Sequence, residues 1–166
     1  MPTGNVMLVL LIKNIVFTVV VPATVAVYLP MLMTRGRTPG SGVLAALGCV
    51  LVVAGALIYL RCAWDFLAFG RGTPAPIDAP KKLVVRGLYR YTRNPMYVGV
   101  LTAILGWSAL YGAMDLVVYG IIVGAAFHLF VVVYEEPHLQ QVFGTSYDEY
   151  RARVGRWLPR LGRRHD

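Results

Sequence analysis

Hydrophobic residues occur along this chain in four long runs that are separated by polar segments. The runs cover residues 6–33, 42–69, 95–111 and 116–134. A helix needs about 20 apolar residues to cross the ~30 Å hydrocarbon core of a bilayer, and each run approaches or exceeds that length. The pattern therefore predicts an all-α polytopic membrane protein with about four transmembrane helices.

The segments between the runs predict how these helices connect. Residues 34–41 are few and contain a Pro-Gly pair, and residues 112–115 leave room only for a tight turn. The third and fourth runs should therefore form a helical hairpin. Residues 70–94 make a long polar connector, and Pro95 suits the first position of the third helix. Pro22 lies inside the first run, where it predicts a kink.

Residues 135–166 form a tail with an amphipathic pattern. Gly144 interrupts this pattern, and Ser146-x-x-Glu149 predicts a capping box that restarts a helix before Pro159 ends it. The apolar residues at helical spacing are Leu139, Val142, Phe143, Tyr147, Tyr150 and Val154. We expect a C-terminal pair of amphipathic helices at the membrane surface, and a single domain over residues 1–166.

Small residues inside the runs predict packing contacts. Gly120-x-x-x-Gly124 has a spacing that allows two helices to approach closely in lipid. Cys49 and Cys62 would lie about 20 Å apart on one helix, which is too far for a disulfide, so we expect both to be packing residues. Lys13 lies inside the first run and no basic segment precedes it, which favours a permanent span over a cleaved signal peptide.

Composition and charge support the membrane assignment and predict an orientation. Hydrophobic residues make up 57% of the chain and charged residues 14%, whereas soluble domains carry roughly 25% charged residues. The net charge of +8 suggests contact with the anionic headgroups of a lipid bilayer, and apolar runs this long exclude a nucleic-acid partner. Twelve basic residues lie in the connector and tail, against two in residues 34–41. The connector and both termini should therefore be cytoplasmic.

Two blocks of sequence contain candidate site residues. Residues 81–99 form a basic, aromatic-rich loop leading into a helix N-terminus, where backbone N–H groups favour an anion. The same block also fits a membrane anchor with interfacial tyrosines. Glu135 and Glu136 end the fourth run, where the helix dipole is already negative. A connector arginine or a cationic ligand should compensate them, unless both are simply solvated.

Three ionisable residues inside the predicted spans need an explanation. His128 lies two turns before Glu135 on the same helix face, so it is either a functional group in the bundle interior or a neutral histidine bonded to another helix. Arg61 and Asp65 share one helix face and form either a structural ion pair or part of a site wall. The sequence contains no metal-ligand spacing, nucleotide-binding glycine loop or Ser-His-Asp order, so we expect no metal.

Four motifs, taken in order, strongly resemble the integral-membrane methyltransferases of the isoprenylcysteine carboxyl methyltransferase and phospholipid methyltransferase superfamily. The resemblance covers residues 81–159 and not the first two spans. The motifs are Gly87-Leu-Tyr-Arg-Tyr-Thr-Arg-Asn-Pro-Met-Tyr-Val-Gly99, Glu135-Glu136, Phe143-Gly-x-x-Tyr147-x-x-Tyr150 and Val154-x-Arg-Trp-x-Pro159.

This resemblance implies S-adenosylmethionine as the methyl donor, with S-adenosylhomocysteine as product, and a small lipophilic acceptor arriving from the bilayer. It implies a cofactor site at the cytoplasmic face, between the last two spans and the tail. Asn94 to Tyr97 match the family's Arg-His-Pro-x-Tyr segment, and Glu135 matches its first cofactor-binding carboxylate. The residues that the resemblance assigns to the cofactor are Lys81, Lys82, Leu83, Val84, Tyr89, Asn94, Pro95, Met96, Tyr97 and Glu135.

The chemistry of the cofactor suits these residues. Glu135 can meet a cationic part of it, while Arg93 and the amides near Pro95 can meet its carboxylate. Tyrosines 89, 91 and 97 offer stacking and cation–π surfaces. If the acceptor needs a general base, His128 or Glu136 would supply it.

Two departures from the family pattern bear on the acceptor. Asn94 stands where the carboxyl methyltransferase branch has a histidine, as in the phospholipid branch, and Val131 stands where eukaryotic carboxyl methyltransferases have a substrate-binding arginine. Both argue against a prenylcysteine carboxylate as acceptor. Two rival functions are a membrane reductase of sterol-reductase type, whose known members are far longer, and a non-enzymatic scaffold or permease with a polar path through Arg61, Asp65 and His128.

Overall fold

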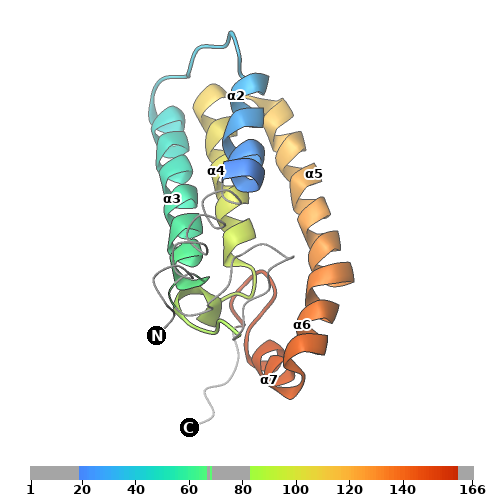
Figure 1. Ribbon diagram of the computed structural model, residues 1–166. Helices are drawn as coiled ribbons and strands as arrows, with labels where there is room; N and C mark the ends of the chain where they lie inside the picture. The colour runs from blue at the N-terminus through green and yellow to red at the C-terminus, as the bar shows by residue number, and fades with distance from the viewer. Residues whose placement is uncertain (1–18, 67, 69–82, 161–166) are drawn as a thin grey trace, which may run out of the picture.

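The computed structural model describes residues 19–66, 68 and 83–160, and within these ranges the chain is all-α. Figure 1 shows α3, α4 and α5 running alongside the N-terminal helical segment, with α6 and α7 gathered at one end. The elements are η1 (Val19–Tyr28), α2 (Leu29–Met33), α3 (Val43–Asp65), η3 (Gly87–Arg90), α4 (Pro95–Tyr111), α5 (Met114–Phe130), η4 (Val131–Glu135), α6 (Glu136–Phe143) and α7 (Thr145–Arg153). The predicted all-α class is confirmed.

Within the part of the chain that the structure describes, two helical stretches are long and apolar enough to cross a membrane, by length and composition. They are Val43–Asp65 and Met114–Phe143, whereas Val20–Met33 and Pro95–Tyr111 are shorter apolar helices. Large apolar side chains on these helices point outward, and Ile121 is 67% exposed. Extended apolar outer faces are rare on soluble monomers, and here they suit contact with lipid.

Two prolines coincide with π-helical segments. Pro22 lies inside η1, and Pro137 is the second residue of α6, two residues after the end of η4. A proline removes one backbone hydrogen bond and clashes with the carbonyl four residues earlier, and a wider π turn relieves that crowding without ending the helix. The helix therefore does not end at residue 134, where the fourth apolar run ends, but continues through η4 into α6 as far as Phe143.

The closest helix contact joins α3 to α4 through glycines spaced seven residues apart on each helix. A Cβ atom added to Gly48 would lie 2.5 Å from the Leu110 nitrogen, and one added to Gly106 would lie 2.6 Å from the Val52 nitrogen. Gly55 and Gly99 face each other in the same way. The two backbones touch, so side chains larger than hydrogen do not fit between them.

Gly120 and Gly124, whose spacing predicted a close helix approach, make looser contacts than the glycines of the α3–α4 contact. A Cβ atom on Gly124 would lie 3.7 Å from the Leu101 side chain, which is ordinary van der Waals contact. One on Gly120 would lie 3.2 Å from Ile104 Cγ2. These glycines therefore face side chains of α4, whereas the glycines between α3 and α4 face backbone.

The core lies along this α3–α4 contact. Its fully buried members include Cys62 and Ile104, with Tyr59, Tyr89 and Val100 around them. Both cysteines are free thiols, as predicted. Cys62 is buried in the core and Cys49 is exposed on the outer face of α3.

The end of the bundle opposite α6 and α7 is closed by short connections. Gly112 has a left-handed conformation with φ of 59° at the end of α4, so α5 begins at Met114 and the predicted tight turn is confirmed. Arg37 donates two hydrogen bonds to the Asp115 carboxylate, at 3.0 and 2.9 Å. This ion pair ties residues 34–41 to the α4–α5 turn.

The tail folds as two short helices, α6 and α7, separated at Gly144. Tyr147, Tyr150 and Val154 are buried and pack against Leu83, Leu139 and Phe143, which confirms the amphipathic spacing. Val142 is exposed instead. The predicted capping box is wrong, because α7 begins at Thr145 without a side-chain cap and ends at Arg153.

Candidate functional site

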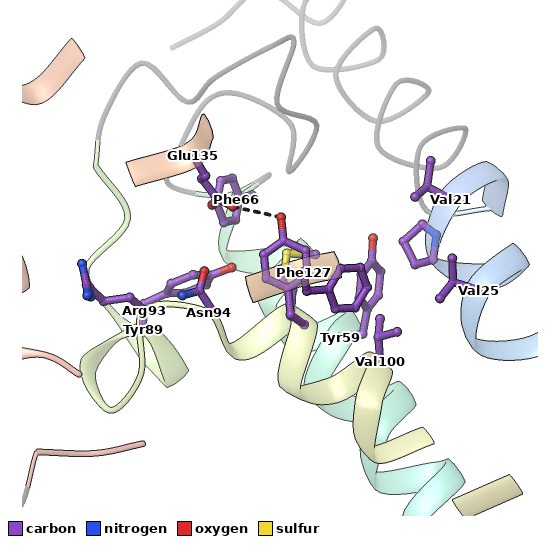
Figure 2. Close-up of a pocket in the computed structure, with 13 residues that line it drawn as sticks. Val21, Val25, Tyr59, Phe66, Tyr89, Arg93, Asn94, Val100, Phe127 and Glu135 are labelled. Atoms are coloured by element: carbon purple, nitrogen blue, oxygen red, sulfur yellow. Dashed lines mark hydrogen bonds between the residues drawn. The ribbon is translucent and has the colours of Figure 1, made fainter. Parts of the chain in front are cut away.

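An open cavity lies where η1, α3, η3, α4 and α5 meet. Figure 2 shows Val21 and Val25 on one side, Arg93 at the opposite end, and Tyr59 and Phe127 between them. One half of the wall is apolar and aromatic. The other half carries polar groups from the connector, the first turn of α4 and the end of η4.

Glu135 and Tyr97 form the central polar contact of the cavity. The Tyr97 hydroxyl donates a hydrogen bond to Glu135 Oε2 at 2.9 Å, drawn as the dashed line in Figure 2. The Phe127 ring lies 4.6 Å from the Tyr97 ring, centroid to centroid. Tyr97 lies in the first turn of α4, and Glu135 is the last residue of η4. The hydrogen bond therefore joins two helical segments through residues that are 38 positions apart in sequence.

Glu136 points away from the cavity, into a cluster with two arginines. Arg156 donates two hydrogen bonds to its carboxylate at 2.7 and 2.9 Å, and Arg93 Nη1 lies 3.1 Å from Oε1. The hydrogen bond to Glu136 raises the pKa of Arg156 above its usual value. The expected cationic compensation is thus present for Glu136. The sequence predicted that the two carboxylates end a helix. The structure instead places them at the junction of η4 and α6, inside a continuing helix.

Arg93 connects this cluster to the cavity. Its side chain is 10% exposed, and Nη1 donates a hydrogen bond to the Tyr147 hydroxyl at 3.1 Å. Burial raises the pKa of Tyr147, and the neighbouring Glu136 raises it further. Among the described residues the buried Arg93 Nε has no hydrogen-bond partner. An unpaired buried donor costs about 1–3 kcal/mol, so this N–H is available to an anionic group.

A small second pocket adjoins the cavity beside Arg93. Arg93, Asn94 and Glu135 line both, and Val131 and Glu136 line the second pocket as well. The cavity is therefore extended toward the tail by a space with a carboxylate and a guanidinium on its walls.

The segment after α7 contacts residues 92–94, directly before α4, and holds them in place. The Gly155 carbonyl accepts a hydrogen bond from the Arg93 backbone at 2.9 Å. The Arg156 carbonyl accepts two more, from Thr92 Oγ1 at 2.9 Å and Asn94 Nδ2 at 3.0 Å. Asn94 is buried and lines the cavity, but its amide is committed to this contact.

Tyr89 closes the cavity from the connector side. Its ring packs edge-on against Phe66 with centroids 5.5 Å apart, and its backbone carbonyl accepts a hydrogen bond from the Tyr150 hydroxyl at 2.7 Å. Burial raises the pKa of the Tyr89 phenol well above its usual value. The ring is therefore a neutral aromatic surface fixed from two sides.

Most of the residues predicted for the cofactor meet at this cavity. The predicted residues that line it are Tyr89, Arg93, Asn94, Met96, Tyr97 and Glu135. Val84 lies in the core, Leu83 packs against the tail, and Pro95 is buried at the start of α4. Lys81 and Lys82 lie outside the described residues.

Two other candidates lie apart from the cavity. His128 is exposed on α5, and its Nδ1 accepts a hydrogen bond from Trp157 Nε1 at 3.1 Å. Of the two alternatives left open by the sequence, the structure is nearer to a histidine bonded to another segment than to a group in the bundle interior. Tyr91, predicted as a stacking surface, is 60% exposed. Arg61 pairs with Asp65, whereas His128 is bonded to Trp157. Two residues of the suggested polar path therefore contact each other, and the third is bonded elsewhere.

The apolar half of the cavity was missed from sequence. Val21, Val25, Phe66 and Phe127 belong to runs in which nearly every residue is apolar, so nothing marks them individually. Pro22 was the one available signal, because it lies in the π-helical segment that borders the cavity.

An apolar groove continues from the cavity along η1, α3 and α4, with about 600 Å³ of empty space. Pro22, Tyr59 and Val100 line both spaces. The rest of the groove is lined by aliphatic side chains and by glycines of the α3–α4 contact, including Gly55 and Gly99. The polar cavity is therefore continuous with a hydrocarbon-like surface.

Comparison with known proteins gives consistent matches. A family model described as phospholipid methyltransferase matches residues 43–146, which is more than half of the chain. The chain is 35% identical over 78 residues to the protein-S-isoprenylcysteine O-methyltransferase of Schizosaccharomyces pombe, an alignment that covers 46% of this chain and 33% of that protein. It is 34% identical over 79 residues to protein-S-isoprenylcysteine O-methyltransferase B of Arabidopsis thaliana, covering 47% of this chain and 40% of that protein.

Proposed function

Because this chain belongs to the phospholipid methyltransferase family, an integral-membrane family, we propose that it transfers a methyl group from S-adenosylmethionine to a small lipophilic acceptor. Methyltransferases of this family use S-adenosylmethionine. The matched segments span about a third of one curated relative and two fifths of the other. The activity, the acceptor and the membrane arrangement of this chain are therefore proposed from its own residues.

The observation that carries the proposal is the composition of the cavity wall. Glu135 offers a carboxylate to the cationic part of the cofactor, and Arg93 Nε offers a buried donor to its carboxylate. Tyr89 and Phe127 offer aromatic faces for the adenine and the sulfonium. Acid, base and aromatic groups thus line one partly closed space in the combination that this zwitterionic, aromatic ligand requires.

The cofactor supplies an electrophilic methyl group on a sulfonium sulfur. Transfer is an in-line displacement in which the acceptor heteroatom forms a bond to the methyl carbon as the carbon–sulfur bond breaks. Such a step needs mainly orientation and exclusion of water. Glu135 and Tyr97 are proposed to orient the reactants, while Val21, Val25 and Phe127 keep water out.

Three ionisable groups are candidates for a catalytic role, and their environments differ. Glu135 lines the cavity, Glu136 is held by Arg93 and Arg156, and His128 is bonded to Trp157. Glu135 is therefore proposed as the group that contacts the reactants.

The apolar groove supports an acceptor that comes from the bilayer. A hydrocarbon tail along α3 and α4 would bring its head to Tyr59 and Val100, where groove and cavity join. Val131 places an apolar side chain on the wall of the adjoining pocket. This environment favours an acceptor head without a carboxylate, methylated on oxygen or nitrogen.

The membrane arrangement proposed from the sequence has four spans in one domain. The two shorter apolar helices, Val20–Met33 and Pro95–Tyr111, would cross beside the two longer ones. The basic residues of the connector and tail favour a cytoplasmic position for both termini and for the cavity.

The proposal is tested by supplying labelled S-adenosylmethionine to membranes that contain the full-length protein. We expect label in a lipid-phase product that is absent from membranes lacking the protein and lost with Glu135→Gln. Glu149 is an exposed carboxylate on α7, so Glu149→Gln is the matched control and should leave labelling unchanged. Equal labelling with and without the protein, across a range of membrane lipids, would contradict the proposal.

A further inference from the structure

Asp65 is a fully buried carboxylate that does not line the cavity. It ends α3, where the helix dipole is unfavourable for a negative charge, and its side chain has no exposed surface. Arg61 Nη1 lies 2.5 Å from Oδ1. Among the described residues neither carboxylate oxygen has a hydrogen-bond partner of regular geometry. Its partner Arg61 is half exposed, and burying a carboxylate beside such a partner often contributes nothing to stability, so the position of Asp65 needs another explanation.

The Arg61–Asp65 pair packs directly against the backbone of Gly87. A Cβ atom on Gly87 would overlap Asp65 Oδ2 and would lie 3.6 Å from Arg61 Nη2. Gly87 also has φ of 58°, in the left-handed region. This glycine opens η3, so the carboxylate of α3 determines where the η3 turn can lie.

The η3 turn carries a wall of the cavity. Tyr89 is two residues after Gly87, and its ring contacts Phe66, the residue that follows Asp65. Cys62 is buried beneath the same turn, one helical turn before Asp65. The tail holds η3 from the other side through the bond from Tyr150. The position of Tyr89 therefore depends on α3 at one side and on α7 at the other.

We propose that Asp65, oriented by Arg61, is a positioning residue for cofactor binding, because it fixes the η3 turn and hence the Tyr89 ring. This proposal rests on the proposed function. It assigns the ion pair to the connector side of the site. It also explains why the contacting residue is a glycine, since any side chain at position 87 would displace the carboxylate or the turn.

The test measures binding of S-adenosylhomocysteine by calorimetry, and Tm, on the purified full-length protein. Asp65→Ala should weaken binding about tenfold, and Gly87→Ala should weaken it at least as much. The double variant should lose less affinity than the product of the two single losses, because removing the carboxylate makes room for the new methyl group while the left-handed φ at position 87 still strains an alanine. Asp115→Ala removes the carboxylate of the exposed ion pair at the other end of the bundle, and it should leave binding unchanged.

The outcomes separate this proposal from the proposed function. A wild-type protein that binds no S-adenosylhomocysteine would contradict the proposed function itself. If the wild type binds and Asp65→Ala binds equally well, or if the losses of the two single variants multiply in the double variant, Asp65 does not position the turn. A lower Tm with unchanged affinity would likewise assign the pair to stability alone. Asp65→Ser, which is also short, carries the same test if Asp65→Ala does not fold.

Discussion

The α3–α4 contact and the cavity end of the bundle are built on opposite principles. Between α3 and α4, regular helices meet through glycines, and backbone touches backbone at Gly48 and Gly106. Around the cavity the helices are irregular, with π turns in η1 and η4, and polar side chains hold them together. Close packing tolerates one geometry only, whereas at the cavity end the successive residues Glu135 and Glu136 point about 100° apart around the helix axis and meet different neighbours. The comparison teaches that rigidity and chemistry are supplied by different parts of this fold.

The largest expected loss of stability comes from a substitution in the close-packed α3–α4 contact. Gly48→Ala puts a methyl group 2.5 Å from the Leu110 backbone nitrogen. Overpacking typically costs about 1–3 kcal/mol, and we expect a loss above about 3 kcal/mol here because the obstructing atoms are backbone. Gly124→Ala is the matched control, because its new methyl group would meet the Leu101 side chain at 3.7 Å and should cost less than about 0.5 kcal/mol. Thermal denaturation of both variants in detergent measures the difference. Equal losses would show that the α3–α4 contact is not the rigid element.

Substitutions of the adjacent residues Glu135 and Glu136 should affect different properties, namely ligand binding for Glu135 and stability for Glu136. Glu136→Gln leaves Arg93 and Arg156 without their anion, so we expect a loss of about 2–3 kcal/mol in the free energy of unfolding. Glu135→Gln should leave Tm nearly unchanged and weaken S-adenosylhomocysteine binding about tenfold to a hundredfold, the usual range for a hydrogen bond to a charged group. Denaturation and calorimetry on both variants test this, and the reverse pattern would exchange the two roles.

Tyr97→Phe tests the binding role of the Glu135 contact with a smaller expected loss of affinity. The variant keeps the ring against Phe127 and removes only the hydroxyl bonded to Glu135. This hydrogen bond acts on the ligand only through Glu135, so we expect the loss in binding to be that of an ordinary hydrogen bond, about 1 kcal/mol or about fivefold in affinity. Tyr111→Phe changes a tyrosine at the other end of α4 and serves as the control. A loss of binding as large as that of Glu135→Gln would mean that Tyr97 does more than orient the carboxylate.

His128→Ala should have the smallest effect on methyl transfer. The side chain is bonded to Trp157 and does not line the cavity, so activity should stay within about threefold, with at most about 1 kcal/mol lost in stability. Labelling assays at several pH values measure this. A pH-dependent step that disappears in the variant would restore His128 as the general base.

The helix limits were predictable where backbone chemistry marks them. Pro95 and Gly112 begin and end the third helix, and the predicted range 95–111 agrees with α4. The end of the fourth helix was not predictable in this way. Pro137 does not end the helix, because the π-helical segment η4 precedes it and the helix continues as α6. The α3–α4 glycines were also missed, since a spacing of seven residues on two separate helices gives no local signal.

The candidate site was predictable only on its polar side. Tyr97 and Glu135 stand out in sequence because polar groups are rare beside apolar runs, and the structure joins them. Val25 and Phe127 resemble their neighbours, so their contribution depends on three-dimensional packing alone. The different roles of Glu135 and Glu136 likewise depend on which groups the fold brings to each carboxylate, which the sequence does not specify.

Titration of the purified full-length protein with S-adenosylhomocysteine tests the central claim most directly. If the cavity that joins Glu135, Tyr97, Arg93 and Tyr89 is a cofactor site, calorimetry should give one site of micromolar affinity that Glu135→Gln weakens without lowering Tm. Absence of binding to the folded wild-type protein, or binding that is identical in Glu135→Gln, would contradict it.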